Sequence, residues 1–240
     1  MLQKTNAIVL SKIKYGERDL IVTCFTKQRG LSSYLLRGIL KSGKGKLKTA
    51  YFQPLSQLLL EEQYNPKSSL HTIKEVRVEF PYTTLHTNVI KSTITLFLSE
   101  TLHAALKQED NHEALYEYIT TSLQWLDHEA QCANFHLLFL LKLTRYLGFY
   151  PEISNANKPY FNLSDGKFEA TDTSPYSIKG ETVEMFIKLL ESDFESVSNL
   201  KFNASQRQGF LNTLMLYFEL HLPGFKKPKS LEILHQLFKT

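Results

Sequence analysis

Residues 73–80 of this chain read Ile-Lys-Glu-Val-Arg-Val-Glu-Phe, and Pro81 follows them. From residue 76 to residue 80, apolar and charged side chains alternate, which is the period of two expected of a β-strand. Beyond Pro81 the apolar residues recur at a spacing near 3.6, which is typical of helices. The change of period predicts an α+β protein, with a β domain over 1–80 and a mostly helical domain over 81–240.

Four more strands are predicted upstream of residue 73, because apolar and β-branched runs alternate there with turn signals such as Tyr15-Gly16-Glu17-Arg18. Their expected ranges are 6–13, 19–26, 31–40 and 54–63. Five short strands within about 80 residues indicate a small closed barrel, and the OB-fold is the five-stranded form of that architecture.

Downstream, helices are predicted over 84–106, about 115–126, 132–147, 181–194, 205–222 and 230–238. Asn111 is placed to cap the second of these helices. Gly148 and Pro151 supply a stop signal after the third. Residues 152–180 are irregular, and the turn Ser164-Asp165-Gly166 within them predicts a β-hairpin.

Charge is divided unevenly along the chain. The formal net charge is +4, yet residues 1–80 hold 14 Lys and Arg against 6 Asp and Glu, while residues 81–240 hold 14 against 18. A basic half points to a polyanionic partner such as nucleic acid. No apolar stretch is long enough for a membrane span, and no leader pattern opens the chain, so we expect a cytoplasmic protein without a membrane partner.

The basic half has a focus in the acid-free segment 37–48. OB barrels bind single strands through a cationic groove and aromatic side chains on which bases stack. We therefore expect nucleic-acid contacts from the cations of this segment, from Arg29, and from neighbouring aromatic residues. The predicted set is Arg29, Tyr34, Arg37, Lys41, Lys44, Lys46, Lys48 and Phe52.

Other chemistries find little support in the sequence. Gly38 to Lys44 nearly complete a phosphate-binding P-loop, but Gly45 stands where Ser or Thr should bind magnesium, and no helical pattern follows. His128, Cys132 and His136 are spaced four apart on a helix, so the outer two lie about 12 Å apart, too far to share one metal ion. No catalytic residues are predicted.

Several ordered motifs resemble those of the RecO family and span nearly the whole chain. They are Ala7-Ile8-Val9-Leu10, Tyr15-Gly16-Glu17-x-Asp19, Phe25-Thr26, Gly30, Arg37-Gly38, Phe52-Gln53-Pro54-Leu55, Tyr146-Leu147-Gly148-Phe149-x-Pro151 and Lys227-Pro228-Lys229-Ser230-Leu231-Glu232. The resemblance implies a recombination mediator in DNA repair that associates with the nucleoid and catalyses no reaction. It implies binding of single- and double-stranded DNA, annealing of complementary strands, and loading of the recombinase RecA on gaps coated by single-strand-binding protein. The implied partners are RecR, RecA and RecF.

Two further expectations follow from the resemblance. Many family members hold a structural zinc ion with four cysteines after the Leu-Gly-Tyr turn, but residues 152–180 contain no cysteine. We therefore expect no zinc or other cofactor, and a hairpin held by packing instead. The closing motif places Lys226, Lys227 and Lys229 before the last helix, where they are predicted to extend the DNA-binding surface.

A receptor for the tail of single-strand-binding protein is predicted on the helix over 132–147. In the family picture this tail is acidic and ends in an apolar aromatic segment, so it requires a cation beside an apolar groove. Lys142 and Arg145 are the cations of that helix, and Leu138, Leu141 and Phe149 are the candidate apolar wall. Two alternatives stay open: an RNA-binding OB protein, and an enzyme whose site assembles in the helical domain.

Overall fold

The computed structural model describes residues 2–41, 47–106 and 113–237, and the chain forms two compact units, Met1–His128 and Glu129–Thr240. The boundary predicted near Pro81 marks the end of the barrel. The first compact unit continues through two helices, of which α1 (Val89–Ala105) packs against the first strand. The second helix, α2 (Glu113–His128), ends that unit. The predicted cap Asn111 lies outside the described residues.

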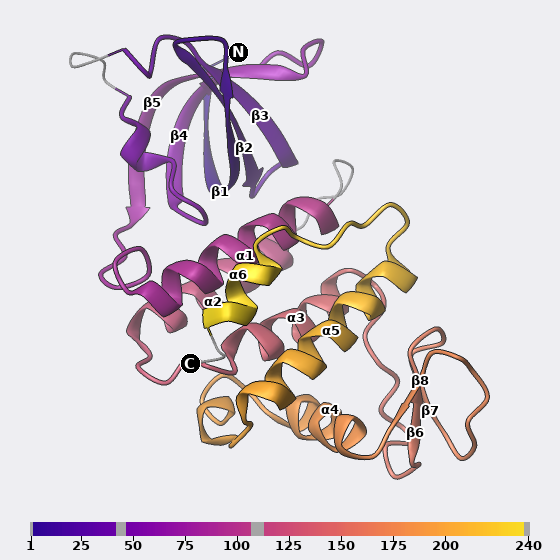
Figure 1. Cartoon of the computed structure of the whole chain (residues 1–240). Coiled ribbons are helices and arrows are strands. Elements are labelled where there is room, and N and C mark those ends of the chain that lie inside the picture. Colours follow the sequence, from indigo (N-terminus) through magenta and orange to yellow (C-terminus); the bar gives the residue numbers. More distant parts are fainter. Residues whose placement is uncertain (1, 42–46, 107–112, 238–240) are drawn as a thin grey trace. The chain divides into compact units, whose positions relative to one another are not determined.

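Five strands close into a barrel in the order β1-β2-β3-β5-β4, which confirms the predicted architecture (Figure 1). They are β1 (Leu2–Tyr15), β2 (Asp19–Thr26), β3 (Gly30–Leu36), β4 (Gln57–Gln63) and β5 (Leu70–Phe80). All neighbours pair antiparallel except β3 and β5, which are parallel and joined through Ser33–Leu70 and Tyr34–His71. β3 ends at Leu36 rather than at Leu40 because a turn follows, with Gly38 at a φ of 68°.

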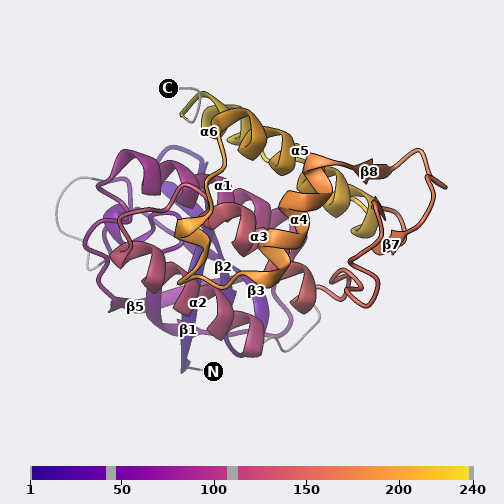
Figure 2. The same ribbon diagram turned by 90° about the horizontal axis from the view of Figure 1, so that it is seen from below.

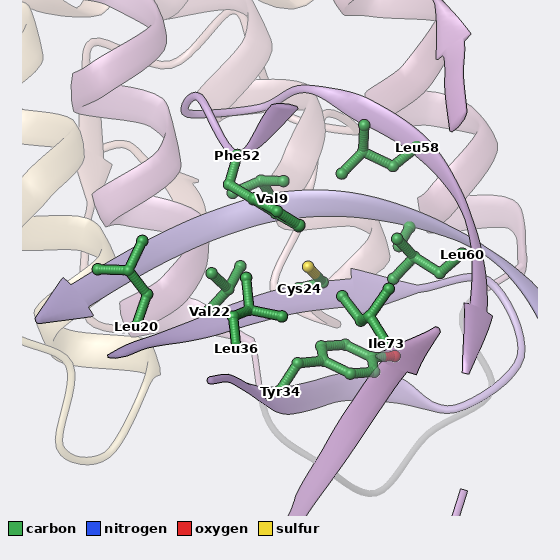
Figure 3. Close-up of a cluster of buried hydrophobic side chains, with 11 residues drawn as sticks. Val9, Leu20, Val22, Cys24, Tyr34, Leu36, Phe52, Leu58, Leu60 and Ile73 are labelled. Atoms are coloured by element: carbon green, nitrogen blue, oxygen red, sulfur yellow. The ribbon is translucent and has the colours of Figure 1, made fainter. Parts of the chain in front are cut away.

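The barrel interior is filled by one face of each strand. Val9, Val22, Cys24 and Leu60 are at most 1% exposed and pack together (Figure 3). Burial raises the pKa of the Cys24 thiol above its usual value, so this cysteine acts as a small apolar side chain. The alternation predicted for the end of β5 is less complete, since Val78 is 45% exposed.

A β-bulge interrupts β1 at Leu10. Before it, Val9 lies opposite the inward-facing Cys24, and after it Ser11 lies opposite Thr23. One extra residue in a strand reverses the face on which the following side chains lie. Beyond the bulge, the odd-numbered residues of β1 therefore lie on the outer face of the barrel, whereas Val9 lies on the inner one.

Asp127 fixes the chain that leaves the barrel to the end of α2. Its carboxylate accepts hydrogen bonds from the backbone N–H groups of Thr83, Thr84 and Leu85 at 2.9, 2.8 and 2.7 Å. The ammonium of the buried Lys91 donates to the Asp127 carbonyl oxygen at 2.8 Å. Burial by itself would raise the pKa of the Asp127 carboxyl, but the hydrogen bonds outweigh it and hold that pKa at about 2.

The second unit is built around α3 (Phe135–Tyr146), whose residues 135–141 are all buried. A helix that is apolar all round must be covered on every side, and α3 contacts α4 (Glu181–Glu191), α5 (Ala204–His221) and the short 3-10 helix η2 (Val197–Asn199). The unit also contains α6 (Leu231–Leu237). Figure 2 shows its small sheet to the side of α4.

The small sheet contains the predicted hairpin. β6 (Tyr160–Asn162) pairs antiparallel with β7 (Lys167–Glu169), and β8 (Ser177–Lys179), which was not predicted, adds to the other edge of β6. The Phe161 ring lies 4.8 Å from Phe168 and 4.4 Å from Phe186 of α4, centroid to centroid. Aromatic packing therefore joins the hairpin to the helices.

We predict that Asp127→Asn destabilises the first unit. In the variant, an amide nitrogen would face backbone N–H donors that now bond to a carboxylate oxygen. The folded protein would also lose the stability that it gains from holding the Asp127 carboxylate in its charged form. The depressed pKa corresponds to about 2 kcal/mol. This stability is present above pH ~4, the ordinary Asp pKa, and is lost as the pH falls toward 2.

Urea unfolding at pH 7 and pH 3 measures this effect. Glu79→Gln is the matched control, because that carboxylate is exposed on β5 and should change stability by less than ~0.5 kcal/mol. Equal unfolding midpoints for Asp127→Asn and the parent at pH 7 would contradict the assignment.

Candidate nucleic-acid interface

The basic segment begins in a turn that is anchored to the β1–β2 hairpin. The Gly38 N–H donates to the Asp19 carboxylate at 2.7 Å, and the Leu40 N–H donates to the Arg18 carbonyl oxygen at 3.0 Å. These bonds hold the turn that carries Arg37 and Lys41 against the hairpin tip that carries Arg18. The side chains of these three cations are exposed.

The rest of the segment is described only in part. Lys48 is exposed and precedes a short 3-10 helix, η1 (Thr49–Tyr51). Lys44 and Lys46 lie outside the described residues, so their predicted phosphate contacts stay predictions.

The two aromatic residues predicted as stacking platforms lie inside the barrel. Tyr34 and Phe52 are both 0% exposed and belong to the core shown in Figure 3. Tyr34 has the same parity on β3 as the inward-facing Leu36, and Phe52 packs on the barrel core from the segment after η1. Neither ring presents a face to a base, so this part of the prediction was wrong.

Arg29 was also predicted to contact nucleic acid, but its charge is neutralised within the barrel. Its guanidinium pairs with the carboxylate of Glu62, whose side chain is 0% exposed, and Gln3 donates to the same carboxylate at 3.0 Å. The guanidinium also lies 4.5 Å from the centre of the Tyr64 ring. A buried carboxylate requires such a partner, so Arg29 is a structural cation in this protein.

Sequence inspection missed a set of cations in the β1–β2 hairpin. Lys12, Lys14 and Arg18 are exposed there, next to the turn that carries Arg37 and Lys41. A signal was present, because residues 12–18 contain three cations against one acid. They were overlooked because the later run of lysines is denser.

In the second unit, Lys226, Lys227 and Lys229 are all exposed between α5 and α6. Lys227 forms an ion pair with Glu219 of α5 at 3.0 Å. Lys226 and Lys229 have no ion pair with the described residues, so they are the better candidates for phosphate contacts.

The predicted tail receptor on α3 is only partly at the surface. Leu138 and Leu141 are 0% exposed and pack inside the unit, so they cannot form an accessible wall, and that part of the prediction was wrong. Lys142 donates from Nζ to the carbonyl oxygen of Leu190 at 2.9 Å, near the C-terminus of α4. Arg145 is exposed and lies 4.5 Å from the centre of the Tyr150 ring.

Phe149 completes the predicted receptor and is half-buried. Its ring stacks on His221 with centroids 5.1 Å apart, and its carbonyl oxygen accepts from the Tyr217 hydroxyl at 2.7 Å. Arg145, Tyr150 and the accessible part of Phe149 are what remains of the receptor at the surface.

The described residues contain no group of three or more His, Cys, Asp and Glu arranged to hold a metal ion. His128 ends α2 in the first unit, whereas Cys132 and His136 lie in the second. Burial, with Arg207 and His235 nearby, lowers the pKa of His136 to about 3, so that this imidazole is neutral. Within the described ranges, no helix is long and apolar enough to cross a membrane.

Comparison with known proteins covers nearly the whole chain. The family model for the N-terminal part of recombination protein O matches residues 1–82, and the model for its C-terminal part matches residues 86–232. The chain belongs to the RecO family. The DNA repair protein RecO of Christiangramia forsetii is 44% identical over 99% of this chain and 100% of its own length. Those of Flavobacterium psychrophilum and Bacteroides fragilis (strain YCH46) are 44% and 35% identical over 98% and 99% of this chain, and over 98% and 100% of their own lengths.

RecO-family membership identifies a non-enzymatic mediator of recombination in DNA repair, and the family in general interacts with DNA and with RecR. It decides against an enzyme site in the helical domain. It also confirms the resemblance seen in the sequence motifs, and the two family models meet between residues 82 and 86, close to the end of β5.

For the C-terminal lysines of this RecO-family chain, we predict that Lys226→Glu/Lys229→Glu weakens DNA binding about tenfold near 0.1 M salt, because two phosphate contacts become repulsive. Filter binding and an annealing assay measure the effect. Lys188→Glu/Lys201→Glu is the control, since both lysines are exposed elsewhere in the same unit. Parental annealing by the first variant would exclude these lysines from the DNA-binding surface.

Proposed function

We propose that this protein binds single- and double-stranded DNA through the exposed cations of its barrel and anneals complementary strands. The observation that carries the proposal is the anchoring of the basic turn to the hairpin, which gathers Arg18, Arg37 and Lys41 at one end of the barrel. Lys12, Lys14 and Lys48 add further exposed positive charge. Of the acids nearby, Asp19 is occupied by the Gly38 N–H.

The mechanism requires no bond to be made or broken by the protein. Cations that neutralise phosphates release condensed counterions and reduce repulsion between two strands bound together. Complementary strands held at high local concentration then pair, and base pairing itself supplies the free energy. A non-enzymatic family and a cationic barrel surface both support this mechanism.

Membership of the RecO family supports a wider role. In this proposal the protein acts in the cytoplasm at the nucleoid, with RecR and in some settings RecF. It exposes gaps covered by single-strand-binding protein and helps to load RecA there. The proposal includes no metal or other cofactor, and the aromatic packing of the hairpin β6–β7 on α4 supports a hairpin that is held without zinc.

Replacing Arg37, Lys41 and Lys48 with Ala should weaken binding to DNA of every sequence alike. The plot of log K against log salt should flatten by roughly 0.7–0.9 for each lost phosphate contact. Fluorescence anisotropy with labelled single and double strands over a NaCl series measures both quantities. Repeating the titration with RNA of the same sequence distinguishes the RNA-binding alternative, which predicts tighter RNA binding.

The control for this variant removes three exposed cations from other surfaces, Lys4→Ala/Lys74→Ala/Lys201→Ala. Net charge then changes equally, but the salt slope should stay close to that of the parent. An unchanged slope in the variant of residues 37, 41 and 48 would exclude them as phosphate ligands.

We further propose that the acidic tail of single-strand-binding protein docks beside Arg145. The Arg145 guanidinium over the Tyr150 ring is exposed and can bind a carboxylate, and the half-buried Phe149 precedes Tyr150 in the chain. Lys142 is the second cation, although its bond to the Leu190 carbonyl oxygen also supports α4.

Lys142→Ala/Arg145→Ala should lower the affinity for a synthetic tail peptide at least tenfold, which is ~1.4 kcal/mol. Calorimetric titration measures this loss, and circular dichroism tests that the variant stays folded. Arg145→Ala alone should account for most of the loss, whereas Lys201→Ala should cause none. Parental affinity in the folded double variant would place the tail elsewhere.

A further inference from the structure

An apolar row crosses the outer face of the barrel beyond the β1 bulge. Ile13 of β1 lies directly opposite Ile21 of β2, and Ile21 lies opposite Leu35 of β3. Tyr15, two residues after Ile13, has the same facing. Ile13 is 59% exposed and Tyr15 is 55% exposed, while Ile21 and Leu35 are half-buried. We call Ile13, Tyr15, Ile21 and Leu35 the hairpin face.

The other half of the same outer surface is covered within the first unit. Phe25 is 0% exposed and its ring lies 6.1 Å from that of Tyr116 on α2. Lys27 pairs there with Glu113 and Glu117 of α2, at 2.9 and 3.2 Å. At the hairpin face, by contrast, Ile13 and Tyr15 stay more than half exposed.

Positive charge borders the hairpin face. Arg37 follows Leu35 by two residues, and Arg18 is in the hairpin turn. Lys12 and Lys14 belong to the same hairpin and are exposed, but they lie on the opposite face of β1 from Ile13 and Tyr15. The ligand that this pattern fits has negative charge along its length and flat apolar groups beside the charge. A single nucleic-acid strand has this chemistry, since its unpaired bases expose their faces next to the phosphates.

We propose that the hairpin face is a stacking platform for unpaired bases, which makes binding selective for single-stranded over double-stranded DNA. The inference rests on the DNA binding proposed above and adds a second kind of contact to it. Base faces inside a duplex are already stacked, so a duplex reaches the surrounding cations with its phosphates but cannot use Tyr15 or Ile13.

The hairpin face favours release of the annealed product. Two single strands use both the cations and the hairpin face, whereas the duplex they form keeps only the phosphate contacts. Affinity therefore falls when pairing is complete, and the product leaves more readily than the reactants. Cations alone would hold the product at least as tightly, because a duplex has the higher charge density.

Variants of one strand separate the two kinds of contact. Ile13→Thr/Tyr15→Thr removes the platform and keeps β-propensity, and Lys12→Thr/Lys14→Thr, in alternate positions of the same strand, removes only charge. The readout is the affinity for a 20-nucleotide single strand and for a duplex of equal length over a NaCl series. The first variant should bind the single strand about tenfold more weakly with an unchanged salt slope, and the duplex less than twofold more weakly. The second should weaken both and flatten both slopes.

Tyr15→Trp provides a test that leaves the face intact. Compared with the parent, whose one tryptophan is Trp125, the added fluorescence should be quenched by saturating single strand and not by saturating duplex. No quenching by the single strand, or equal quenching by both, overturns the proposal. The proposal is also overturned if Ile13→Thr/Tyr15→Thr binds the single strand as tightly as the parent does. In that case the hairpin face would be a candidate surface for a protein partner. If the parent binds neither DNA, the proposed function itself fails, and that result is distinct from all of these.

Discussion

The first unit depends on one long strand, β1, which pairs with two neighbouring strands. β1 pairs with β4 from Leu2 to Ile8 and with β2 from Ala7 to Tyr15, so it carries the sheet around the barrel. Closure on the far side rests on only two residue pairs between β3 and β5. Because the inner face of each strand must fill a narrow interior, large side chains such as Tyr34 are used as core. The end of the β1–β2 hairpin has no interior to fill, and this is where cations and apolar groups stay exposed.

Burial thus separates the charged and aromatic side chains that stabilise the barrel from those that are available to a ligand. Inside the barrel, the charge of Glu62 is balanced by Arg29, and the ring of Tyr34 is sealed from solvent. Outside, the basic turn and the hairpin tip are joined through Asp19, so the backbone segments that carry their cations are held next to each other. A mediator that catalyses no reaction can act only by positioning its ligands, and a rigid arrangement of charges on a barrel end is suited to this.

The order and type of elements followed from local patterns, since the change of period at Pro81, the turn signals and the stop at Gly148 are all short-range. The residues of the candidate site were harder to predict from the sequence, because they depend on which face of each strand lies inside the barrel. The closeness of Tyr34 and Phe52 to lysines in the sequence predicts a surface position, but the register of β3 places Tyr34 in the core, and the segment after η1 packs Phe52 onto that core. Arg29 finds its partner 33 residues away, and neither Leu138 nor Leu141 could be distinguished from a surface leucine without the packing of α3.

The bulge at Leu10 means that residue count, and not only residue identity, determines the surface of this barrel. If the same residues continued beyond Val9 in a regular ladder, without the bulge, Ile13 and Tyr15 would face the inside of the barrel and Lys12 and Lys14 would face outward. The unpaired residue at position 10 therefore decides which side chains of the hairpin lie on the outer face. A deletion of Leu10 would restore the regular ladder and keep Ser11 opposite Thr23, so the outer face would survive the loss of the residue that creates the bulge.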